Sequence, residues 1–390
     1  MVIINIIIII LVVAIMSTLL VLNKSSKNKK NFHIKQQNKQ TIDRTPETGK
    51  FFESTNDITL TESNDISDYE GDFLDIFIKK SRKDHFESEF VPLTLEQLED
   101  NDKKAIKSKL SVIPPLPNIA HELINILGDE SASSSKVSNI ASKDPILAGK
   151  LLQLVNSSFF GLRQEVNSIG RAIVLLGFNT VKNFVIQSQL SKVIPKFEKD
   201  LFSLENFWSH SLASSVCAYH LSSGITDIQQ SILSTIALLH DIGKIAIAFY
   251  KPDTYKKFKE ELDKNDSDEP TIIIEEKILG VNHALVGYLL AENWELPEYI
   301  RKTILYHHHP TFVTPDSIPT DYAKAVTILH FSDLISKLCG LSIDNDIITG
   351  IRNEYFSLVG KTPPIESLID QKTSFEIQKT KYFVKSQMKN

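Results

Sequence analysis

The chain has 390 residues, 43 Lys and Arg against 48 Asp and Glu, and a formal net charge of −5 with a sequence pI of ≈ 6.1. This balance lacks the basic footprint of a nucleic-acid-binding protein, so we expect no nucleic-acid partner. Its two cysteines, Cys217 and Cys339, lie far apart without C-x-x-C spacing, which excludes a disulfide framework and a zinc ribbon. Because the first quarter is polar, the length leaves one globular unit of about 280 residues.

The N-terminus begins with an apolar stretch, Val2–Leu22, of 21 residues without a charged side chain. A helix of this length spans the roughly 30 Å hydrocarbon core of a bilayer. A secretory signal peptide would have basic residues before the stretch and a small-residue cleavage site after it, and neither is present. The lysines follow the stretch instead. We therefore predict a transmembrane anchor at 1–22, uncleaved and single-pass, with the C-terminal bulk in the cytoplasm.

Residues 23–90 are rich in Lys, Asn, Gln, Ser, Thr, Asp and Glu without a sustained apolar period, which predicts a flexible polar linker. A coil of this length has a mean end-to-end distance on the order of 50 Å, so the domain would stand off the membrane. Its last part, Gly71–Phe90, combines apolar and basic residues. That part is open to two interpretations, a short amphipathic helix or a solvated linker with a few apolar contacts.

From Pro92 onward the apolar residues recur at three- and four-residue spacing, and no alternating run is long enough for a sheet. The pattern predicts an all-α fold. Thr94 and Gln97 have the spacing of a capping box at the start of a helix over Leu93–Leu110. Further helices are predicted near 118–127, 134–142, 145–155, 168–176 and 179–192, with breaks at Gly128, Pro145, Gly161 and Gly177.

The most informative motif is His240-Asp241, inside the run Leu238–Lys244. An imidazole and a carboxylate on consecutive residues can reach one divalent ion together. Gly243 would let the backbone turn, and Lys244 would place a positive charge where it could hold a phosphate. An adjacent His and Asp is common by chance, so the pair alone is weak support for a metal site.

Other potential ligands surround this pair on segments with helical periodicity. Beside His210 the small residues Ala213, Ser214 and Cys217 would let one helix approach a central site closely, although tight helix packing explains them equally well. Each histidine taken alone fits ordinary helix surface or a satisfied core position better than a metal ligand. The candidate ligands, in chain order, are His210, His240, Asp241, His283, His307, His308 and Asp333.

This order resembles the HD superfamily of metal-dependent phosphohydrolases, and in particular its HDOD (HD-related output domain) branch. The closer match lies in short strings spread over roughly 108–340, which favours metal ligation for the set as a whole. The resemblance implies an N-terminal helical half at 91–199, an HD-like helical half at 200–345, and a C-terminal helical extension or tail at 346–390. The strings are Ile113–Pro117, Ser142–Leu147, Leu154–Gly161, Ile173–Phe178, Phe207–Ser211, Leu238–Lys244, Leu279–Gly287, Trp294–Pro297 and Tyr306–Pro310.

The resemblance also implies a ligand assignment. His210, His240, Asp241 and Asp333 would hold one divalent ion, and His283, His307 and His308, with Asp241 as a bridge, would hold a second. Iron, manganese and zinc all suit such mixed ligands, and no other cofactor is expected. Lys244 and Asp241 would be catalytic if the protein is an enzyme.

The HD-GYP phosphodiesterases carry a glycine-rich stretch ending in Gly-Tyr-Pro after the double histidine, whereas here Thr311–Asp316 takes that place. Two functions therefore stay open. We favour a membrane-tethered cytoplasmic HDOD signalling module that acts by binding a protein partner, still unknown, or a small ligand. The alternative is a metal-dependent phosphohydrolase that acts on a nucleotide or another phosphoester signal.

Overall fold

The computed structural model describes residues 89–388, apart from 126–129, 158–159, 199–200, 265–268 and 344–350. Within these ranges the chain is helical and contains no strand, which confirms the predicted all-α class. The predicted anchor at 1–22 and nearly all of the predicted linker at 23–90 lie outside the described residues.

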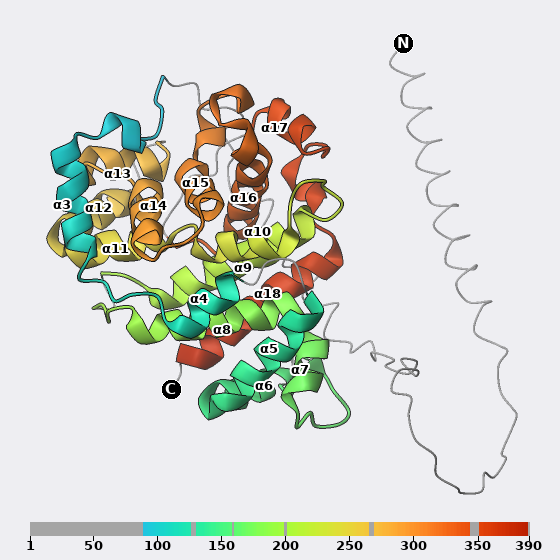
Figure 1. The fold of residues 1–390 in the computed structure, drawn as a ribbon. Helices are drawn as coiled ribbons and strands as arrows, with labels where there is room; N and C mark the ends of the chain where they lie inside the picture. Colours follow the sequence, from blue (N-terminus) through green and yellow to red (C-terminus); the bar gives the residue numbers. More distant parts are fainter. Residues whose placement is uncertain are drawn as a thin grey trace, which may run out of the picture. The chain divides into compact units, whose positions relative to one another are not determined.

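The first helices form the N-terminal part of the domain, with α5, α6 and α7 grouped at one end (Figure 1). Local signals set their ends. The side chain of Asp144 accepts hydrogen bonds from Ile146 N and Leu147 N, both 3.1 Å, ahead of α6. Gly177, with a φ of +84°, separates α7 from α8. The elements are η1 (Leu95–Gln97), α3 (Asp100–Leu110), α4 (Asn118–Asn125), α5 (Glu130–Lys143), α6 (Pro145–Val155), α7 (Ile169–Leu176) and α8 (Phe178–Val193).

One predicted helix, Leu93–Leu110, is wrong in its first part. The Gln97 side chain does accept a hydrogen bond from the backbone N–H of Thr94 at 2.6 Å, but it closes a single 3₁₀ turn and α3 begins only at Asp100. Tertiary contacts explain the difference, because the backbone N–H of Leu93 donates to Glu276 Oε1 at 2.8 Å. This contact holds the segment that begins at Leu93 against α13. The segment therefore does not continue into α3 as one helix.

In the second group of helices, α9 packs against α10 and α16, and it also packs against α18 near the C-terminus. One of the small residues beside His210 is at the contact with α16: Ser214 Oγ and Ser336 Oγ lie 2.6 Å apart, which brings α9 and α16 together. The elements are α9 (Leu204–Leu221), α10 (Gln230–Leu239), α11 (Ile242–Tyr250), α12 (Pro252–Lys264), α13 (Thr271–Leu279), α14 (His283–Asn293), α15 (Glu298–Tyr306), η3 (His309–Thr311), η4 (Pro315–Ser317) and α16 (Thr320–Leu338).

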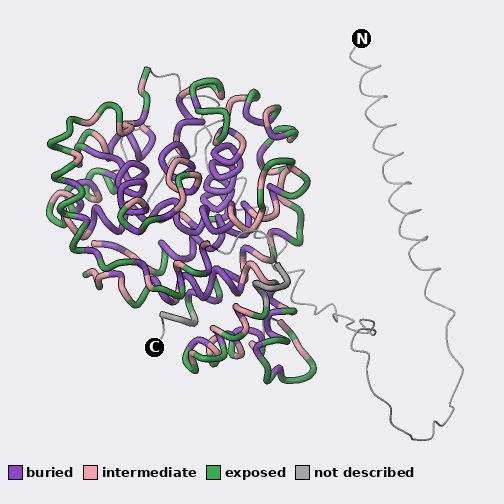
Figure 2. The backbone as a smooth tube through the Cα atoms, viewed as in Figure 1, coloured by how far each residue is buried: buried purple, intermediate pink, exposed green. Residues whose placement is uncertain are grey.

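The C-terminal segment, for which the sequence left a helix or a tail open, is helical. It contains α17 (Asn353–Leu358), η5 (Ile365–Leu368) and α18 (Gln371–Met388). α18 runs along α9, and its Phe383 stacks on Phe184 of α8 with ring centroids 3.6 Å apart. The last helix therefore joins α8 to α9 and belongs to the same core. Buried residues dominate the central helices, whereas the α5–α7 group shows more exposed chain (Figure 2).

One stretch among the described residues, Gln230–Tyr250, is long and apolar enough to cross a membrane, with a mean hydropathy of 1.6. A second candidate exists only if α7 and α8, which meet at 112°, count as one broken span. The first stretch consists of α10 and α11 and is 89% buried inside the domain. Its apolar character is that of a core helix pair, because the interior of the domain surrounds it on all sides.

Candidate metal centre

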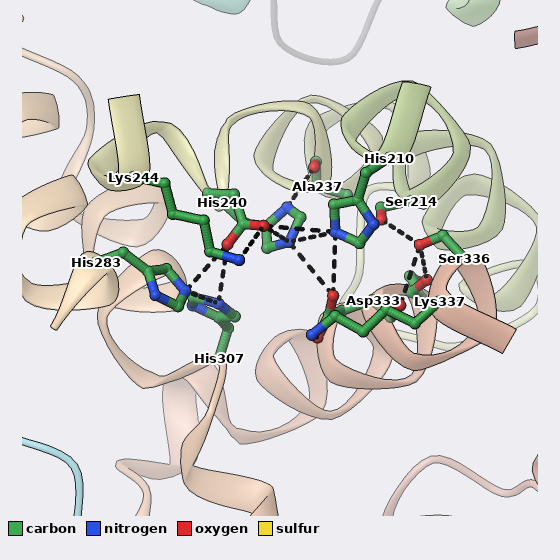
Figure 3. Close-up of polar contacts among 12 residues, drawn as sticks. His210, Ser214, Ala237, His240, Lys244, His283, His307, Asp333, Ser336 and Lys337 are labelled. Carbon is green, nitrogen blue, oxygen red and sulfur yellow. Dashed lines mark hydrogen bonds and ion pairs between the residues drawn. The ribbon is translucent and has the colours of Figure 1, made fainter. Parts of the chain in front are cut away.

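The side chains predicted as metal ligands come together inside the domain. Figure 3 labels five of them, His210, His240, His283, His307 and Asp333. All of the predicted ligands are at most 1% exposed except His308, which is partly buried. They come from α9, the turn between α10 and α11, the start of α14, the end of α15, and α16. In that order these elements carry His210, His240 with Asp241, His283, His307 with His308, and Asp333.

Three of the histidine rings are fixed by the backbone. In each, Nδ1 lies at hydrogen-bond distance from a carbonyl oxygen and must therefore donate its proton there. The other ring nitrogen, Nε2, is then left with a lone pair that faces the centre, as in metal-ligating histidines. The pairs are His210 with Leu341 O at 2.8 Å, His240 with Ala237 O at 2.7 Å, and His307 with Ile304 O at 2.6 Å.

The fourth ring, His283, is oriented by a carboxylate. Glu275 Oε2 lies 2.7 Å from His283 Nδ1 and also accepts from the backbone N–H of His283 at 2.9 Å. Burial alone would lower the pKa of His283, but the charges of Glu275 and Asp241 outweigh it and raise the pKa to about 9. A buried carboxylate behind a ligand histidine raises the basicity of the ring and fixes its direction.

The inward-facing atoms are too close to one another for neutral side chains alone. His210 Nε2 and His240 Nε2 lie 3.3 Å apart, and His283 Nε2 lies 3.3 Å from His307 Nε2. Where both rings of a pair are neutral and each keeps its proton on Nδ1, lone pairs face one another at this distance; His283 avoids this only by carrying a second proton or a cation. A cation among them removes this repulsion.

The carboxylates at the centre also have unsatisfied atoms. Asp241 Oδ2 and Asp333 Oδ1 are buried and have no hydrogen-bond partner among the described residues. Asp241 Oδ1 lies 3.0 Å from His283 Nε2, whereas Asp241 Oδ2 lies 3.5 Å from His210 Nε2. This one carboxylate therefore faces both histidine groups. The donor set fits two divalent ions that share Asp241.

Two groupings of these ligand atoms, each within 4.8 Å, share Asp241. One joins it to His210 and His240, and the other joins it to His283, His307 and His308. Asp333 Oδ1 lies 3.1 Å from His210 Nε2, beside the first grouping. The structure thus brings together the residues of both predicted ion sites; their roles as ligands stay predictions.

A further histidine, His330, was missed from the sequence. It lies one turn before Asp333 on α16, and its Nδ1 is 3.0 Å from the carbonyl oxygen of His307. Its Nε2 is buried without a hydrogen-bond partner among the described residues. Burial lowers the pKa of His330 to about 4, so the ring is neutral and can act as a ligand. His330, His308 and Asp333 form a third potential metal group, and the i, i+3 spacing to Asp333 was the available signal.

Each central carboxylate is paired with a buried lysine. Lys244 Nζ lies 3.4 Å from Asp241 Oδ2, and Lys337 Nζ lies 2.9 Å from Asp333 Oδ2. Burial raises the pKa of Asp333, but the charge of Lys337 and the nearby His210 ring outweigh it and hold the pKa well below its usual range. For Asp241, burial is outweighed in the same way by His240 and Lys244. Both carboxylates are therefore ionised and available to a cation.

The turn at Gly243 has a different cause from the one predicted. Gly243 has no positive φ and lies within the first turn of α11. A Cβ at this position would lie 2.0 Å from the backbone oxygen of His283 and 2.6 Å from Gly287 N. Glycine is required there because α11 and α14 are in backbone contact. This contact places Asp241 against His283.

The space beside the centre is small. A cavity of about 30 Å³ lies between Lys244, His308, His330, Asp333 and Phe312. This volume is about the size of one or two water molecules. A nucleotide or another phosphoester would not fit in it without movement of the surrounding side chains.

The profile of the HDOD domain family matches residues 113–310. A protein of Treponema pallidum (strain Nichols) is 24% identical over 249 residues, which are 63% of this chain and 46% of that protein, so the chain spans about half the length of this relative. An HDOD domain protein of unknown function from Geobacter sulfurreducens has a similar structure, with a TM-score of 0.52, 18% identity, and coverage of 75% of this chain and 95% of that one. A protein from Marinobacter aquaeolei VT8, named for signal transduction, gives a TM-score of 0.53 at 18% identity, covering 84% and 66%. At these identities the structural similarity shows the fold alone.

Proposed function

We propose that this chain, which belongs to the HDOD family, is a signalling module that holds a divalent metal centre and acts by binding a protein partner. The observation that carries the proposal is a complete set of convergent ligand atoms beside a cavity of about 30 Å³. Such a site has the chemistry to hold metal, whereas a phosphoester would enter the cavity only if the surrounding side chains moved. Metal binding would then stabilise the junction of four helices with the turn between α10 and α11 rather than process a substrate.

The segment after His308 supports a closed site. Phe312, 5% exposed, packs against Ile272 and Ile273 of α13 and meets the ring of Phe90 edge-on, with centroids 4.9 Å apart. The hydroxyl of Tyr355 donates to the carbonyl oxygen of Val313 at 2.8 Å. Packing on one side and a hydrogen bond on the other hold this segment over the cavity.

A metal-dependent phosphohydrolase is the second candidate, and the ligand set favours it. A bound pair of divalent ions would supply an activated water and neutralise phosphoryl charge. Lys244 contributes a buried ammonium group beside Asp241. Against this function, the sequence has no glycine between Gly287 and Gly340 and has Pro310, Pro315 and Pro319 after the double histidine. Prolines restrict the backbone where a phosphate-approaching loop needs freedom.

Elemental analysis and a hydrolysis assay on the full-length chain test the proposal together. We expect iron, manganese or zinc in the wild type and its loss in Asp241→Ala, because this carboxylate faces both histidine groups. Asp316→Ala is the matched control, since Asp316 is an exposed carboxylate on η4. We expect no hydrolysis of cyclic-di-GMP with manganese or iron supplied. Metal-dependent turnover that disappears in Asp241→Ala would establish the phosphohydrolase instead, and a metal-free wild type would contradict both candidates.

We further propose that Val2–Leu22 anchors the module in the membrane with its C-terminal bulk in the cytoplasm. The support is the uncharged length of this stretch and the lysines that follow it. A reporter fused after Lys30 should be active only in its cytoplasmic form. Activity of a reporter that works only outside the cytoplasm would refute this topology.

A further inference from the structure

Close to the start of the described residues, positions 90–93 form a short non-helical segment, which we call the strap. Phe90 is half-buried and Pro92 is buried, whereas Val91 between them is 46% exposed. Alternate side chains of an extended segment point to opposite sides. Phe90 and Pro92 therefore face the domain, and Val91 faces the solvent.

The strap is held at Leu93 by two side chains. The backbone N–H of Leu93 donates to Glu276 Oε1 at 2.8 Å, and its carbonyl oxygen accepts from Asn282 Nδ2 at 3.2 Å. Asn282 Nδ2 also donates to Glu276 Oε1 at 2.6 Å. Asn282 is fully buried, and its Oδ1 accepts from Leu285 N at 2.8 Å as the N-cap of α14. The strap is thus fixed both to α13 and to the start of α14.

The two residues that hold the strap are neighbours in sequence of the pair that orients a candidate metal ligand. Glu275 precedes Glu276 on α13, and His283 follows Asn282 at the start of α14. Glu275 Oε2 lies 2.7 Å from His283 Nδ1. The Glu276–Asn282 and Glu275–His283 pairs are therefore adjacent links between the same two helices. Because contacts this close are mechanically connected, a displacement of α13 from α14 changes both links at once.

The other end of the strap lies against the wall of the small cavity. Phe90 packs against Ile272, Ile273 and Phe312, and its ring meets that of Phe312 edge-on with centroids 4.9 Å apart. Ile272 and Phe312 also line the cavity of about 30 Å³ beside His283. These two side chains therefore contact the strap on one side and form the cavity wall on the other.

We propose that the strap regulates the exchange of metal at His283, so that a docked strap retains the ion and a released strap lets it leave. This inference rests on the proposed metal centre and names a control on it. When docked, Phe90 keeps the cavity wall in place, and Leu93 keeps α13 and α14 together. Release removes both restraints, so the cavity opens and the His283 ring loses its fixed direction. A partner that acts on the chain before Phe90 would then change metal occupancy.

Hydrogen–deuterium exchange and the rate of zinc release to a chelating dye test the proposal on the full-length, zinc-loaded chain. Asn282→Asp keeps the oxygen that caps α14 but replaces the donor to Leu93 and Glu276 by a second carboxylate oxygen. We expect faster exchange over residues 90–98. Zinc release should be about tenfold faster, because a hydrogen bond is lost and two carboxylates repel each other.

Phe90→Ala removes the other restraint. It should raise exchange over residues 90–98 and accelerate zinc release about fivefold, because the contact of two aromatic rings is lost. Val91→Ala is its matched control, since Val91 is in the strap but exposed. Asn156→Asp is the control for Asn282→Asp, because Asn156 Nδ2 donates to Val166 O at 2.8 Å in the N-terminal part of the domain. Both controls should keep the wild-type exchange and the wild-type release rate.

Phe90 is only half-buried, so its variant tests the strap even if Asn282→Asp fails to fold. A variant with faster exchange over residues 90–98 but the wild-type rate of zinc release would overturn the proposal and leave the metal centre standing. Unchanged exchange in both variants would equally refute it. In the wild type, zinc should protect residues 90–98, because the strap and the ion each favour the other by the same factor, and equal protection after chelation would contradict this linkage. A wild type that binds no zinc would refute the metal centre itself, and the regulatory strap with it.

Discussion

Replacing Gly243 with alanine tests whether the contact between α11 and α14 sets the metal centre. The new Cβ would lie 2.0 Å from the backbone oxygen of His283, whereas ordinary contacts begin at 3.4 Å. Backbone atoms cannot rotate away as a flexible side chain does. The two helices must therefore separate by more than about 1 Å. Asp241 is two residues before the substitution, and its partner His283 lies on the opposite helix.

The expected cost follows from this geometry. Overpacking a close-packed interior costs about 1–3 kcal/mol, and a backbone contact this short belongs at the upper end. We expect the free energy of unfolding to fall by about 3 kcal/mol, which lowers Tm by roughly 6 °C in a domain of this size. The 3.0 Å distance between Asp241 Oδ1 and His283 Nε2 would lengthen by a similar separation. Bound metal should therefore fall well below the wild-type content.

Calorimetry and elemental analysis measure both effects, and Gly149→Ala is the matched control. Gly149 lies on α6, is exposed, and a Cβ there would meet nothing within 4 Å. That substitution should stabilise the protein by about 0.5–1 kcal/mol, because alanine is the better helix former. If Gly243→Ala kept the wild-type Tm and metal content, the close contact of α11 and α14 would not position the ligands.

Three further predictions concern groups around the ligands. Glu275→Gln removes the carboxylate charge that faces His283 Nδ1. It should weaken the affinity for metal about 10–100-fold in a competition assay with a chelating dye. In the metal-free chain, Glu275 and Asp241 raise the pKa of His283 from an ordinary 6.5 to about 9. The protonated ring therefore stabilises the folded chain fully below pH 6.5, and this contribution is lost as pH rises through 9. Urea unfolding between these pH values should show a loss of up to about 3 kcal/mol in wild type and a much smaller one in Glu275→Gln. Phe312→Ala opens the cavity beside the centre and should raise the rate of metal release to a chelator without loss of the ligands, whereas an unchanged rate would show that this side chain does not close the site.

The sequence predicted helices well where local chemistry marks their ends. Asp144 with Pro145 marks the start of α6, and Gly177, at a positive φ, ends α7, so both helices were predicted to within a residue. The helix predicted from Leu93 failed because the contact that fixes this segment is with Glu276, far along the chain. Periodicity carries no information about such a partner.

At the metal centre, too, some residues could be predicted from the sequence and others depend on contacts that form only on folding. The chain order of histidines and aspartates, through its resemblance to the HD superfamily, named residues that the fold brings together, although it missed His330. Glu275 and Lys337 were missed because their roles depend on the direction of one side chain after packing. Glu275 reaches His283 through a bend between α13 and α14, and Lys337 reaches Asp333 along one face of α16. Gly243 was named, but its reason, the approach of a second helix, exists only in the folded chain.

The burial of the ligands bears on how a signalling module would use them. A metal centre whose ligands come from four helices and the turn between α10 and α11 stabilises the arrangement in which all of these elements are in place, and it disfavours any state that separates them. His210 and Asp333 lie on α9 and α16, which also meet through Ser214 and Ser336. A shift of α9 relative to α16 would therefore change both the ligand geometry and a packed helix contact. Because α18 packs along α9, a partner or ligand that moves α18 acts on the same helix that carries His210. If a partner binds one arrangement of these helices more tightly than another, metal occupancy and partner binding are thermodynamically linked, and each should change the affinity for the other by the same factor.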